Sequence, residues 1–554
     1  MENLNILNNS KTENIYIKRN SKSNKYYIIL FIFLIFISSY IYINFSKKHK
    51  RIIQNDLNSN DLNQTNKKGN NKFIKLNSYN IYMDNVEDLY TKKIFFISPF
   101  DNCPKTYFFK PKYTKEKHKY FDLKETNITL ISSDDYESIP TYISEKVNGT
   151  RKKYFKKLGF KLYKKMNFAN IYLTPYTINT QLRNELNTFV IDKYQKINKF
   201  YNYKEYVSKS LLYRNYKIFK DKFPSDFNYM LESYSYPEDK KIIETKFKNY
   251  TLNISDKDNK DIWLIKPKLG SLGDDIQLFS NLSSVKSENY ILTKYLSNPH
   301  LIRHYKYDFR FYGLVSTIKP LKLYLYNEGF LRIATEKFNF SIYDLKNKYA
   351  FLTNIFINKQ NKNKYIYPEN IRKIEDSNLW NFETFQNYCK RKKIGYNKIY
   401  SEVSDIFIKM IITVREKLIE EIIKNKLKCS NFYHLIGFDI ILDNNLKPYL
   451  LEANRRCQFR DDNEAEKYYT YNIFTDTLNI IGIREYDYKN LNDKSYKTKE
   501  DIKENIEESL CELNRPRGGY NLIFPLKNNF NKYKKFFGSN IPKEDRELWK
   551  KIKE

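Results

Sequence analysis

The feature that most constrains this chain is a pair of apolar strands joined by a tight Asn-Asn turn. The strands cover residues 437–443 and 446–454, and apolar runs joined this closely predict an antiparallel hairpin. Side chains alternate between the two faces of a strand, so Glu452 and Asn454 point to the same face. Asp439 reaches that face from the neighbouring strand. The sequence therefore predicts a hairpin that presents three oxygen-bearing side chains together.

These three side chains predict a metal site. Two carboxylates and an amide on otherwise buried strands are costly unless they are paired or bound to a cation. Oxygen ligands are those that Mg²⁺ prefers, so Asp439, Glu452 and Asn454 are the expected ligands. The alternative is an ordinary hairpin whose carboxylates pair with lysine or arginine.

A strand with one charged face precedes the hairpin. In residues 305–311, strict alternation places Lys306, Asp308 and Arg310 on one face and the aromatic side chains on the other. A bound nucleotide would use such a face, with donors for its base or phosphates and a carboxylate for its ribose hydroxyls. The alternative is a solvated sheet face.

Two shorter strands follow this one. Residues 321–326 and 330–335 flank an Asn-Glu-Gly sequence, which is a hairpin signature. Arg332 is therefore expected on a rigid strand, close to a turn.

A lysine ends another predicted strand, at residues 263–267. The loop after Lys266 contains Gly270 and Gly273, and the backbone N–H groups of such a loop approach phosphate oxygens closely. This pattern is consistent with a phosphate-binding loop. The alternative is an ordinary strand and turn with a surface lysine.

An uncharged segment at residues 26–45 predicts a transmembrane helix, because roughly 20 apolar residues cross the core of a bilayer. A secretory signal peptide is the competing interpretation, but its apolar region is usually shorter and ends in small residues. Lysine and arginine flank the segment on both sides, so charge leaves the topology open. We expect a single-pass membrane protein.

The chain carries 98 Lys and Arg against 64 Asp and Glu, a net charge of +34. Such a field attracts acidic partners, including nucleic acid, an anionic membrane or acidic polypeptide tails. No recognition motif for nucleic acid accompanies the charge, so nucleic acid is not the expected partner. The five cysteines form no CxxC pair, so we expect reduced thiols rather than a zinc site or a disulfide framework.

A chain of 554 residues is long enough for two or three packed domains. Folded structure is expected from about residue 92, where alternating strand and helix patterns begin. The expected divisions are an N-terminal tail (1–25), the transmembrane helix (26–45), a flexible linker (46–91), an N-terminal α/β domain (92–205), a central subdomain (206–300), a C-terminal subdomain with the metal site (301–486) and a polar linker with a basic extension (487–554).

In these motifs the sequence resembles the tubulin tyrosine ligase-like family, from about residue 209 to residue 483. The likeness is specific because several motifs occur in the family's order. The matching residues are Lys209, Lys266-Pro267, Thr293-Lys294-Tyr295-Leu296, Lys306, Asp308, Arg310, Arg332, Leu352-Thr353-Asn354, Asp439, Glu452 and Asn454. The resemblance implies an α+β, ATP-grasp-like multi-domain fold with mixed and antiparallel sheets.

The resemblance also implies roles for residues of these motifs. ATP would be bound by Lys209, Lys266, Gly270, Gly273, Lys294, Leu296, Lys306, Asp308, Thr353 and Asn354. The catalytic residues would be Arg310, Arg332 and Glu452, and Mg²⁺ would be held by Asp439, Glu452 and Asn454. Within this set, Lys209 and Lys266 would lie at phosphates, Lys294 and Lys306 near adenine, Asp308 at ribose and Arg310 at the acyl phosphate.

The implied reaction joins a carboxylate to an amine. The substrate carboxylate attacks the γ-phosphate of ATP, and the amine of a free amino acid captures the acyl phosphate. The family's acceptor is tubulin, whose acidic tails suit a chain of charge +34. Glutamate is the favoured amino acid because residues 447–452 look like the glutamate- and glycine-adding members, with tyrosine and glycine as alternatives. The catalytic part is expected in the cytosol, associated with microtubules.

Three residues depart from the family's pattern. Asp275 stands where the phosphate loop usually has its second Gly, Phe351 replaces a His, and Cys457 replaces a Pro. A carboxylate beside phosphate is unfavourable, so the alternative function is a catalytically silent, membrane-tethered microtubule-binding protein. Because the metal and arginine positions match, we expect an active ligase.

Overall fold

The structure is a computed structural model of the chain. It describes residues 93–97, 103–109, 129–133, 139–143, 149–163, 169–174, 195–251, 262–268, 276–285, 288–339, 347–368, 371–454, 457, 464–484, 502–538 and 541–553. The expected transmembrane segment and linker lie outside these ranges, as do Gly270, Gly273 and Asp275 of the expected phosphate loop. No helix within the ranges is long and apolar enough to cross a membrane. The expected single-pass membrane location is therefore withdrawn, because no described helix supports it and the residues on which it rested lie outside the described part.

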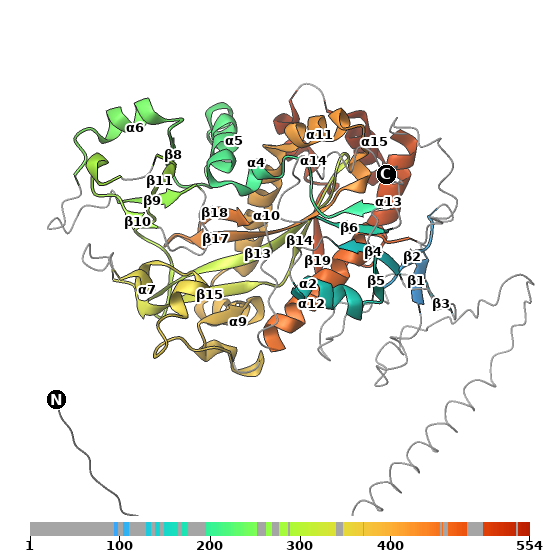
Figure 1. The fold of residues 1–554 in the computed structure, drawn as a ribbon, viewed down its shortest axis with the longest axis horizontal. Coiled ribbons are helices and arrows are strands. Elements are labelled where there is room, and N and C mark those ends of the chain that lie inside the picture. The colour runs from blue at the N-terminus through green and yellow to red at the C-terminus, as the bar shows by residue number, and fades with distance from the viewer. Residues whose placement is uncertain are drawn as a thin grey trace, which may run out of the picture. The chain divides into compact units, whose positions relative to one another are not determined.

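The largest sheet is antiparallel and has eight strands among the described residues. They are β12 (Leu301–Ile302), β13 (Tyr305–Ile318), β14 (Leu321–Tyr326), β15 (Phe330–Lys337), β16 (Leu379–Asn381), β17 (His434–Leu442), β18 (Pro448–Asn454) and β19 (Tyr520–Phe524). The long strand β13 runs through its middle (Figure 1). Tyr307, Phe309 and Phe311 of β13 lie in the main hydrophobic core, so the expected alternation along this strand is confirmed.

The expected hairpin at residues 321–335 is wrong. β14 and β15 both pair with β13, and because β17 occupies the opposite edge of β13, the two strands share one edge. β14 and β15 follow one another along this edge of β13. The turn at Lys319-Pro320 connects β13 to β14. Gly329 lies at the junction of the two strands. A Cβ there would be 2.4 Å from the carbonyl oxygen of Arg310, so a side chain would not fit.

Helices cover both faces of this sheet. The aromatic face packs against α9 (Phe382–Lys392), α10 (Tyr396–Ile412) and α11 (Arg415–Lys424), and the other face against α12 (Glu464–Ile481). Phe407 of α10 stacks on Phe438 of β17 with ring centroids 5.0 Å apart. Phe330 of β15 meets Tyr469 of α12 edge-on at 4.9 Å. The sheet is therefore buried on both sides, which explains its apolar strands.

A smaller antiparallel sheet lies beside β17 and β18 (Figure 1). Its strands are β8 (Ser233–Tyr236), β9 (Trp263–Pro267), β10 (Gln277–Leu278) and β11 (Tyr290–Lys294), and the helices of this region are α4 (Lys204–Val207), α5 (Lys209–Lys222) and α6 (Lys240–Phe247). Trp263 packs edge-on against Phe247 of α6 at 5.0 Å. Met230 forms an isolated bridge with Leu450 of β18, which links the two sheets.

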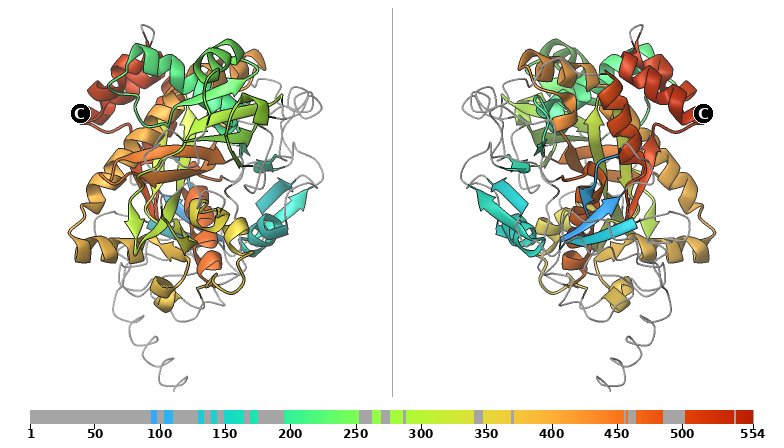
Figure 2. Two further views of the ribbon diagram at one scale, coloured as in Figure 1. Left: turned by 90° about the vertical axis from the view of Figure 1, so that its left-hand side faces the viewer. Right: turned by 90° about the vertical axis from the view of Figure 1, so that its right-hand side faces the viewer.

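The N-terminal part of the chain forms two further sheets. One is antiparallel and contains β1 (Lys93–Ile97), β2 (Thr106–Tyr107) and β3 (Thr129–Ser133). The other is parallel and contains β4 (Ile139–Ile143), β5 (Phe160–Tyr163), β6 (Ile171–Leu173) and β7 (Lys196–Ile197), with α2 (Gly149–Lys157). Figure 2 shows strands of the parallel sheet, in cyan, beside the large sheet. The expected α+β fold with antiparallel sheets is confirmed, but each sheet of the described residues is either wholly antiparallel or wholly parallel, and none of them is mixed.

The C-terminal segment is tied into the large sheet. β19 pairs with β14, and Arg415 of α11 forms a fully buried ion pair of 2.5 Å with Asp545 near the end of the chain. The remaining described elements are η4 (Leu282–Ser284), α7 (Lys348–Phe351), α8 (Ile355–Asn358), η6 (Ile371–Asp376), η7 (Cys429–Asn431), α13 (Ile502–Leu513), α14 (Phe530–Lys534), η9 (Lys535–Phe537) and α15 (Lys543–Lys553). The end of the chain is therefore part of the packed fold.

The expectation that all five cysteines are reduced is wrong. Cys103 and Cys511 form a disulfide across a sequence separation of 408 residues, with their Cα atoms 5.5 Å apart. The other three cysteines are free and buried. The pairing joins the segment before β2 to α13, and two cysteines so far apart in the sequence form no recognisable motif.

Candidate active site

Strand register brings the predicted charged residues together. Arg332 of β15 lies opposite Asp308 of β13. Asp439 of β17 lies opposite Arg310 of β13 on one side and opposite Glu452 of β18 on the other. Directly opposed residues share a face of the sheet. These side chains therefore form one row across four neighbouring strands, on the face opposite the aromatic core.

Asp308, Arg310, Arg332 and Asp439 form a buried network that we call the arginine–aspartate cluster. Arg332 donates to Asp308 from Nε at 2.7 Å and from Nη2 at 2.5 Å, and its Nη2 is 2.8 Å from Asp439. Arg310 donates to Asp439 from Nε at 2.5 Å and from Nη2 at 3.1 Å. Burial raises the pKa of Asp439, but the two arginine charges outweigh burial and hold that pKa well below its usual range. Asp439 is therefore an anion at neutral pH.

Glu452 and Asn454 extend the row toward the expected metal site. Burial raises the pKa of Glu452, and the negative charge of Asp439 raises it further. The side-chain amide of Asn454 is oriented so that its nitrogen faces Glu452 and its oxygen faces Arg310, because only this orientation forms both hydrogen bonds. The nitrogen donates to Glu452 at 3.3 Å, and the oxygen accepts from Arg310 Nη2 at 3.3 Å. A cation would relieve the repulsion between the two carboxylates, and the all-oxygen donor set fits Mg²⁺.

The expected metal trio contains only two carboxylates. Within the described ranges, no group of three or more Asp, Glu, His or Cys side chains is suited to hold a metal ion. Both oxygens of Asp439 accept from arginine, so the pairing that the sequence left as the alternative is present at this residue. The fit to Mg²⁺ therefore depends on Glu452, Asn454 and the lone pairs that Asp439 retains.

Two predicted phosphate-binding lysines line a small cavity next to Glu452, which we call the lysine cavity. Lys209 begins α5, Lys266 lies on β9, and Ser233 and Thr293 also line the cavity. Burial lowers the pKa of Lys266 to about 8, an effect that Glu452 opposes and Lys209 increases. Two cations that interact this closely favour an anion between them, as a phosphate group would be.

Lys306 lies on the same face of β13 as the cluster. It donates to the Tyr295 hydroxyl at 2.8 Å and to the Phe351 carbonyl at 2.7 Å, and it lies 4.4 Å from the centre of the Tyr295 ring. Burial lowers the pKa of Lys306 to about 7, an effect that Asp308 opposes and Lys266 increases. Phe351, which replaces the family's His, contributes only its backbone carbonyl to this contact, and any residue would supply that group.

The other residues expected around the nucleotide have structural partners in the described chain. The Lys294 ammonium lies 6.0 Å from the centre of the Trp263 ring, and Leu296 and Thr353 are buried. Asn354 caps α8 by accepting a backbone N–H at 2.8 Å. Contact of these side chains with a nucleotide stays a prediction.

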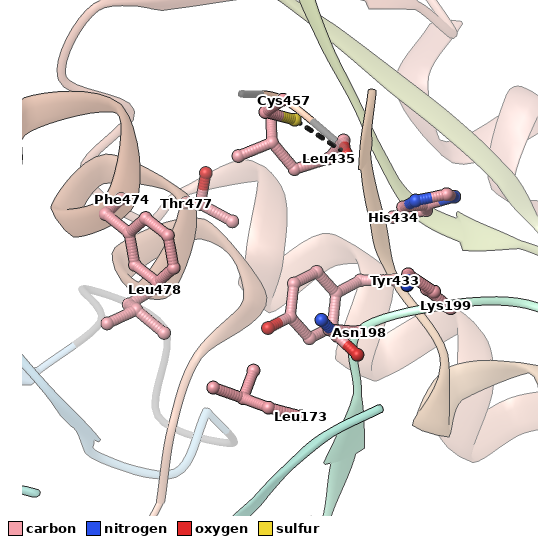
Figure 3. Close-up of a pocket in the computed structure, with 10 residues that line it drawn as sticks. All are labelled: Leu173, Asn198, Lys199, Tyr433, His434, Leu435, Cys457, Phe474, Thr477 and Leu478. Atoms are coloured by element: carbon pink, nitrogen blue, oxygen red, sulfur yellow. Dashed lines mark hydrogen bonds between the residues drawn. The ribbon is translucent and has the colours of Figure 1, made fainter. Parts of the chain in front are cut away.

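A second hollow lies beside β17 (Figure 3). The thiol of Cys457 donates to the Leu435 carbonyl at 3.0 Å, and Thr477 of α12 lines the same hollow. His434 Nδ1 is hydrogen-bonded to the hydroxyl of Tyr206. Cys457, where the sequence departs from the family's pattern, is therefore a buried thiol that is hydrogen-bonded to β17.

Sequence reasoning did not single out three polar residues around the lysines as site residues. Ser233 donates to Thr293 at 3.2 Å in the lysine cavity, and Tyr295 holds the Lys306 ammonium. Thr293 and Tyr295 belong to the Thr293–Leu296 motif, so their signal was present in the sequence. Ser233 had no local signal, because the pairing of β8 with β11 places it there.

Comparison with known proteins assigns the same region to one family. The sequence profile of the tubulin-tyrosine ligase family matches residues 189–491, a little over half of the chain. The matched region contains the arginine–aspartate cluster, the lysine cavity, Glu452 and Asn454.

Several curated proteins match part of the chain. The chain is 30% identical over 304 residues to tubulin polyglutamylase TTLL7 of Xenopus tropicalis, which covers 53% of this chain and 32% of that protein. It is 28% identical over 392 residues to human tubulin polyglutamylase TTLL6, with coverage of 67% and 42%. It is also 28% identical over 296 residues to mouse tubulin monoglutamylase TTLL4, with coverage of 53% and 24%. The chain thus spans less than half the length of each relative.

Proposed function

Because the chain belongs to the tubulin-tyrosine ligase family, we propose that it is an ATP-dependent ligase that adds glutamate to a carboxylate of tubulin. The observation that carries this proposal is the row of charged side chains across β15, β13, β17 and β18, next to the lysine cavity. The names of the three relatives describe polyglutamylation or monoglutamylation of tubulin. They support glutamate as the amino acid.

In the proposed reaction, a tubulin carboxylate attacks the γ-phosphate of ATP and releases ADP, and the glutamate amine then displaces phosphate from the acyl carbon. Lys209 and Lys266 would neutralise phosphate oxygens from the lysine cavity. Glu452, Asn454 and Asp439 would hold Mg²⁺, which neutralises charge that develops on the transferred group. The chain therefore supplies cations to one region where negative charge accumulates.

Arg310 and Arg332 are the proposed catalytic arginines. Both guanidinium groups are held by carboxylates at 2.5 to 3.1 Å and are buried. Donors that are fixed before the substrate binds need no reorganisation when charge develops. Asp308 anchors Arg332 and retains lone pairs, so it is also the proposed contact for the ribose hydroxyls.

The remaining nucleotide contacts follow the family's motif. Lys306 lies beside Tyr295 at one end of the row, and it interacts electrostatically with Lys266. We place adenine near Lys306 and Lys294, with Leu296, Thr353 and Asn354 close by. The net charge of +34 suits an enzyme that approaches an acidic polypeptide tail.

The proposal is tested by incubating the purified full chain with tubulin, Mg-ATP and labelled glutamate, tyrosine or glycine in separate reactions. We expect ATP-dependent incorporation of glutamate, located on a tubulin tail by mass spectrometry. Glu452→Gln should reduce incorporation at least about 100-fold, because it removes a proposed metal ligand. Glu402→Gln changes a partly exposed carboxylate on α10, is the matched control and should retain activity. Incorporation of none of the three amino acids would overturn the ligase proposal.

A catalytically silent tubulin-binding protein is the second candidate. It is favoured by the observation that both oxygens of Asp439 are already engaged by arginines. Mg-dependent binding of ATP and cosedimentation with microtubules, without incorporation of any amino acid, would support this candidate. Incorporation that is lost in Glu452→Gln and retained in Glu402→Gln would eliminate it.

A further inference from the structure

A second charged cleft lies where β7, η7, the end of α12 and α13 meet. We call it the α13 cleft, and none of the site residues described above lines it. Four segments of the chain contribute to it, and α12 and α13 are in contact. Its charged and amide side chains are Lys196, Lys428, Arg484, Glu504, Asn505 and Glu508.

Two buried donors in the α13 cleft have unused hydrogen-bonding capacity. Asn505 is only 7% exposed, and its Nδ2 has no hydrogen-bond partner among the described residues. Lys196 is 9% exposed, and within the same ranges its ammonium makes one hydrogen bond, of 2.9 Å to the Ser430 carbonyl, and no ion pair. Buried donors of this kind are normally satisfied, so they indicate a missing acceptor.

The charges around Lys196 are predominantly positive. Glu508 forms ion pairs with both Arg484 and Arg515. The Nη2 atom of Arg515 lies 2.7 Å from the Glu508 carboxylate. Burial lowers the pKa of Lys196 to about 7, and Arg515 and Arg484 contribute to that decrease. Glu512, which opposes this decrease, is paired with Lys322, and Glu504 is paired with Lys428. The nearby carboxylates are therefore engaged by other cations, and Lys196 lies in a positive field.

We propose that the α13 cleft binds a small oxyanion, a phosphate or carboxylate group, through the Lys196 ammonium and the Asn505 amide. Both groups are donors, and an oxyanion offers several acceptor lone pairs to satisfy them. Lys428 and Arg484 line the same cleft and add positive charge around the ligand. This site is independent of ATP binding and of the proposed ligase activity.

The test is isothermal titration calorimetry of the full chain without ATP, at pH 8. Inorganic phosphate and acetate are titrated separately, against sodium chloride at matched ionic strength. We expect saturable binding of at least one of them. Binding should take up a proton, because the anion restores the charge of Lys196, so the measured heat should change with the ionisation enthalpy of the buffer. Tighter phosphate binding would indicate a phosphate-bearing ligand, and tighter acetate binding a carboxylate ligand.

Three variants distinguish this site from a structural role. Lys196→Met should weaken binding about tenfold or more and abolish proton uptake, because it removes a charge-assisted hydrogen bond. Lys196→Arg should retain binding without proton uptake, since arginine stays charged. Asn505→Leu should weaken binding severalfold, and its effect does not depend on the folding of the Lys196 variants.

One control separates the α13 cleft from the lysine cavity. Lys266→Met should leave the proton-coupled binding intact, because Lys266 does not line the α13 cleft. The proposal is overturned if neither anion binds more tightly than chloride. It is equally overturned if Lys196→Met and Asn505→Leu bind like the wild type, or if Lys266→Met alone abolishes binding.

Discussion

The arginine–aspartate cluster and the lysine cavity are neighbouring regions of one site, yet their charges are balanced differently. Each guanidinium of the cluster is paired with a carboxylate at 2.5 to 3.1 Å. In the cavity, Lys266 interacts with a second lysine, and burial lowers its pKa to about 8. The cluster is therefore complete within the chain, whereas the cavity favours an external anion. This difference separates the part of the site that folding builds from the part that a substrate completes.

The largest effect is expected from a substitution that disrupts the arginine–aspartate cluster. Arg332→Met leaves Asp308 and Asp439 without one of their partners, and removal of one member of a buried ion pair costs about 3–5 kcal/mol of unfolding free energy. Arg303→Met is the matched control, because Arg303 forms an exposed pair with Glu375 that is worth about 0–1 kcal/mol.

Urea denaturation, followed by circular dichroism, measures both variants against the wild type. If Arg332→Met is no less stable than Arg303→Met, the cluster is not a stabilising feature and the comparison fails.

A smaller effect, on nucleotide affinity, is expected from a substitution in the lysine cavity. Lys266→Met should weaken binding of a non-hydrolysable Mg-ATP analogue about 10- to 100-fold, which corresponds to loss of a charged hydrogen bond of about 1.5–3 kcal/mol. Folding stability should not fall, because the variant removes a desolvated charge. Lys268→Met, two residues along and paired with Glu238, is the control and should bind the analogue normally.

Calorimetric titration gives the affinity and thermal melting gives the stability. A large loss of stability with unchanged nucleotide affinity would assign Lys266 to the fold and not to the nucleotide.

The smallest expected effect is a pH dependence of stability that Lys306 should show and the arginines of the arginine–aspartate cluster should not. Burial lowers the pKa of Lys306 to about 7, whereas an unfolded lysine titrates near 10.4. Between these values the unfolded chain binds more protons, so stability rises with pH by up to about 1.4 kcal/mol per unit. Lys306→Met should lose this contribution.

Unfolding free energies at pH 7, 8 and 9 test the sign. The difference between wild type and Lys306→Met should shift in favour of the wild type as pH rises. Lys337→Met, at an exposed position on β15, should show a constant difference. A constant difference for Lys306→Met as well would mean that Lys306 is charged throughout this range.

Local sequence pattern was sufficient for the faces of the strands. The alternation in residues 305–311 placed Lys306, Asp308 and Arg310 on one face, and the structure has them there because side chains alternate in any extended chain. The hairpin of β17 and β18 was predicted for a related reason, since two apolar runs joined by a short turn have few other ways to pair. The charged residues of these strands could therefore be chosen from the sequence, whereas Ser233 of the lysine cavity could not.

The tertiary structure decided how these elements meet. The Asn-Glu-Gly sequence looked like a hairpin turn, but the length of β13 lets β14 and β15 follow one another along one edge. Cys103 and Cys511 pair across 408 residues, and Arg310 contacts Asp439 across 129. Strand alternation is set by the geometry of neighbouring peptide units, so it is visible in a short window. Strand register and long-range pairing depend on the whole chain burying its apolar surface at once, so no local window contains them.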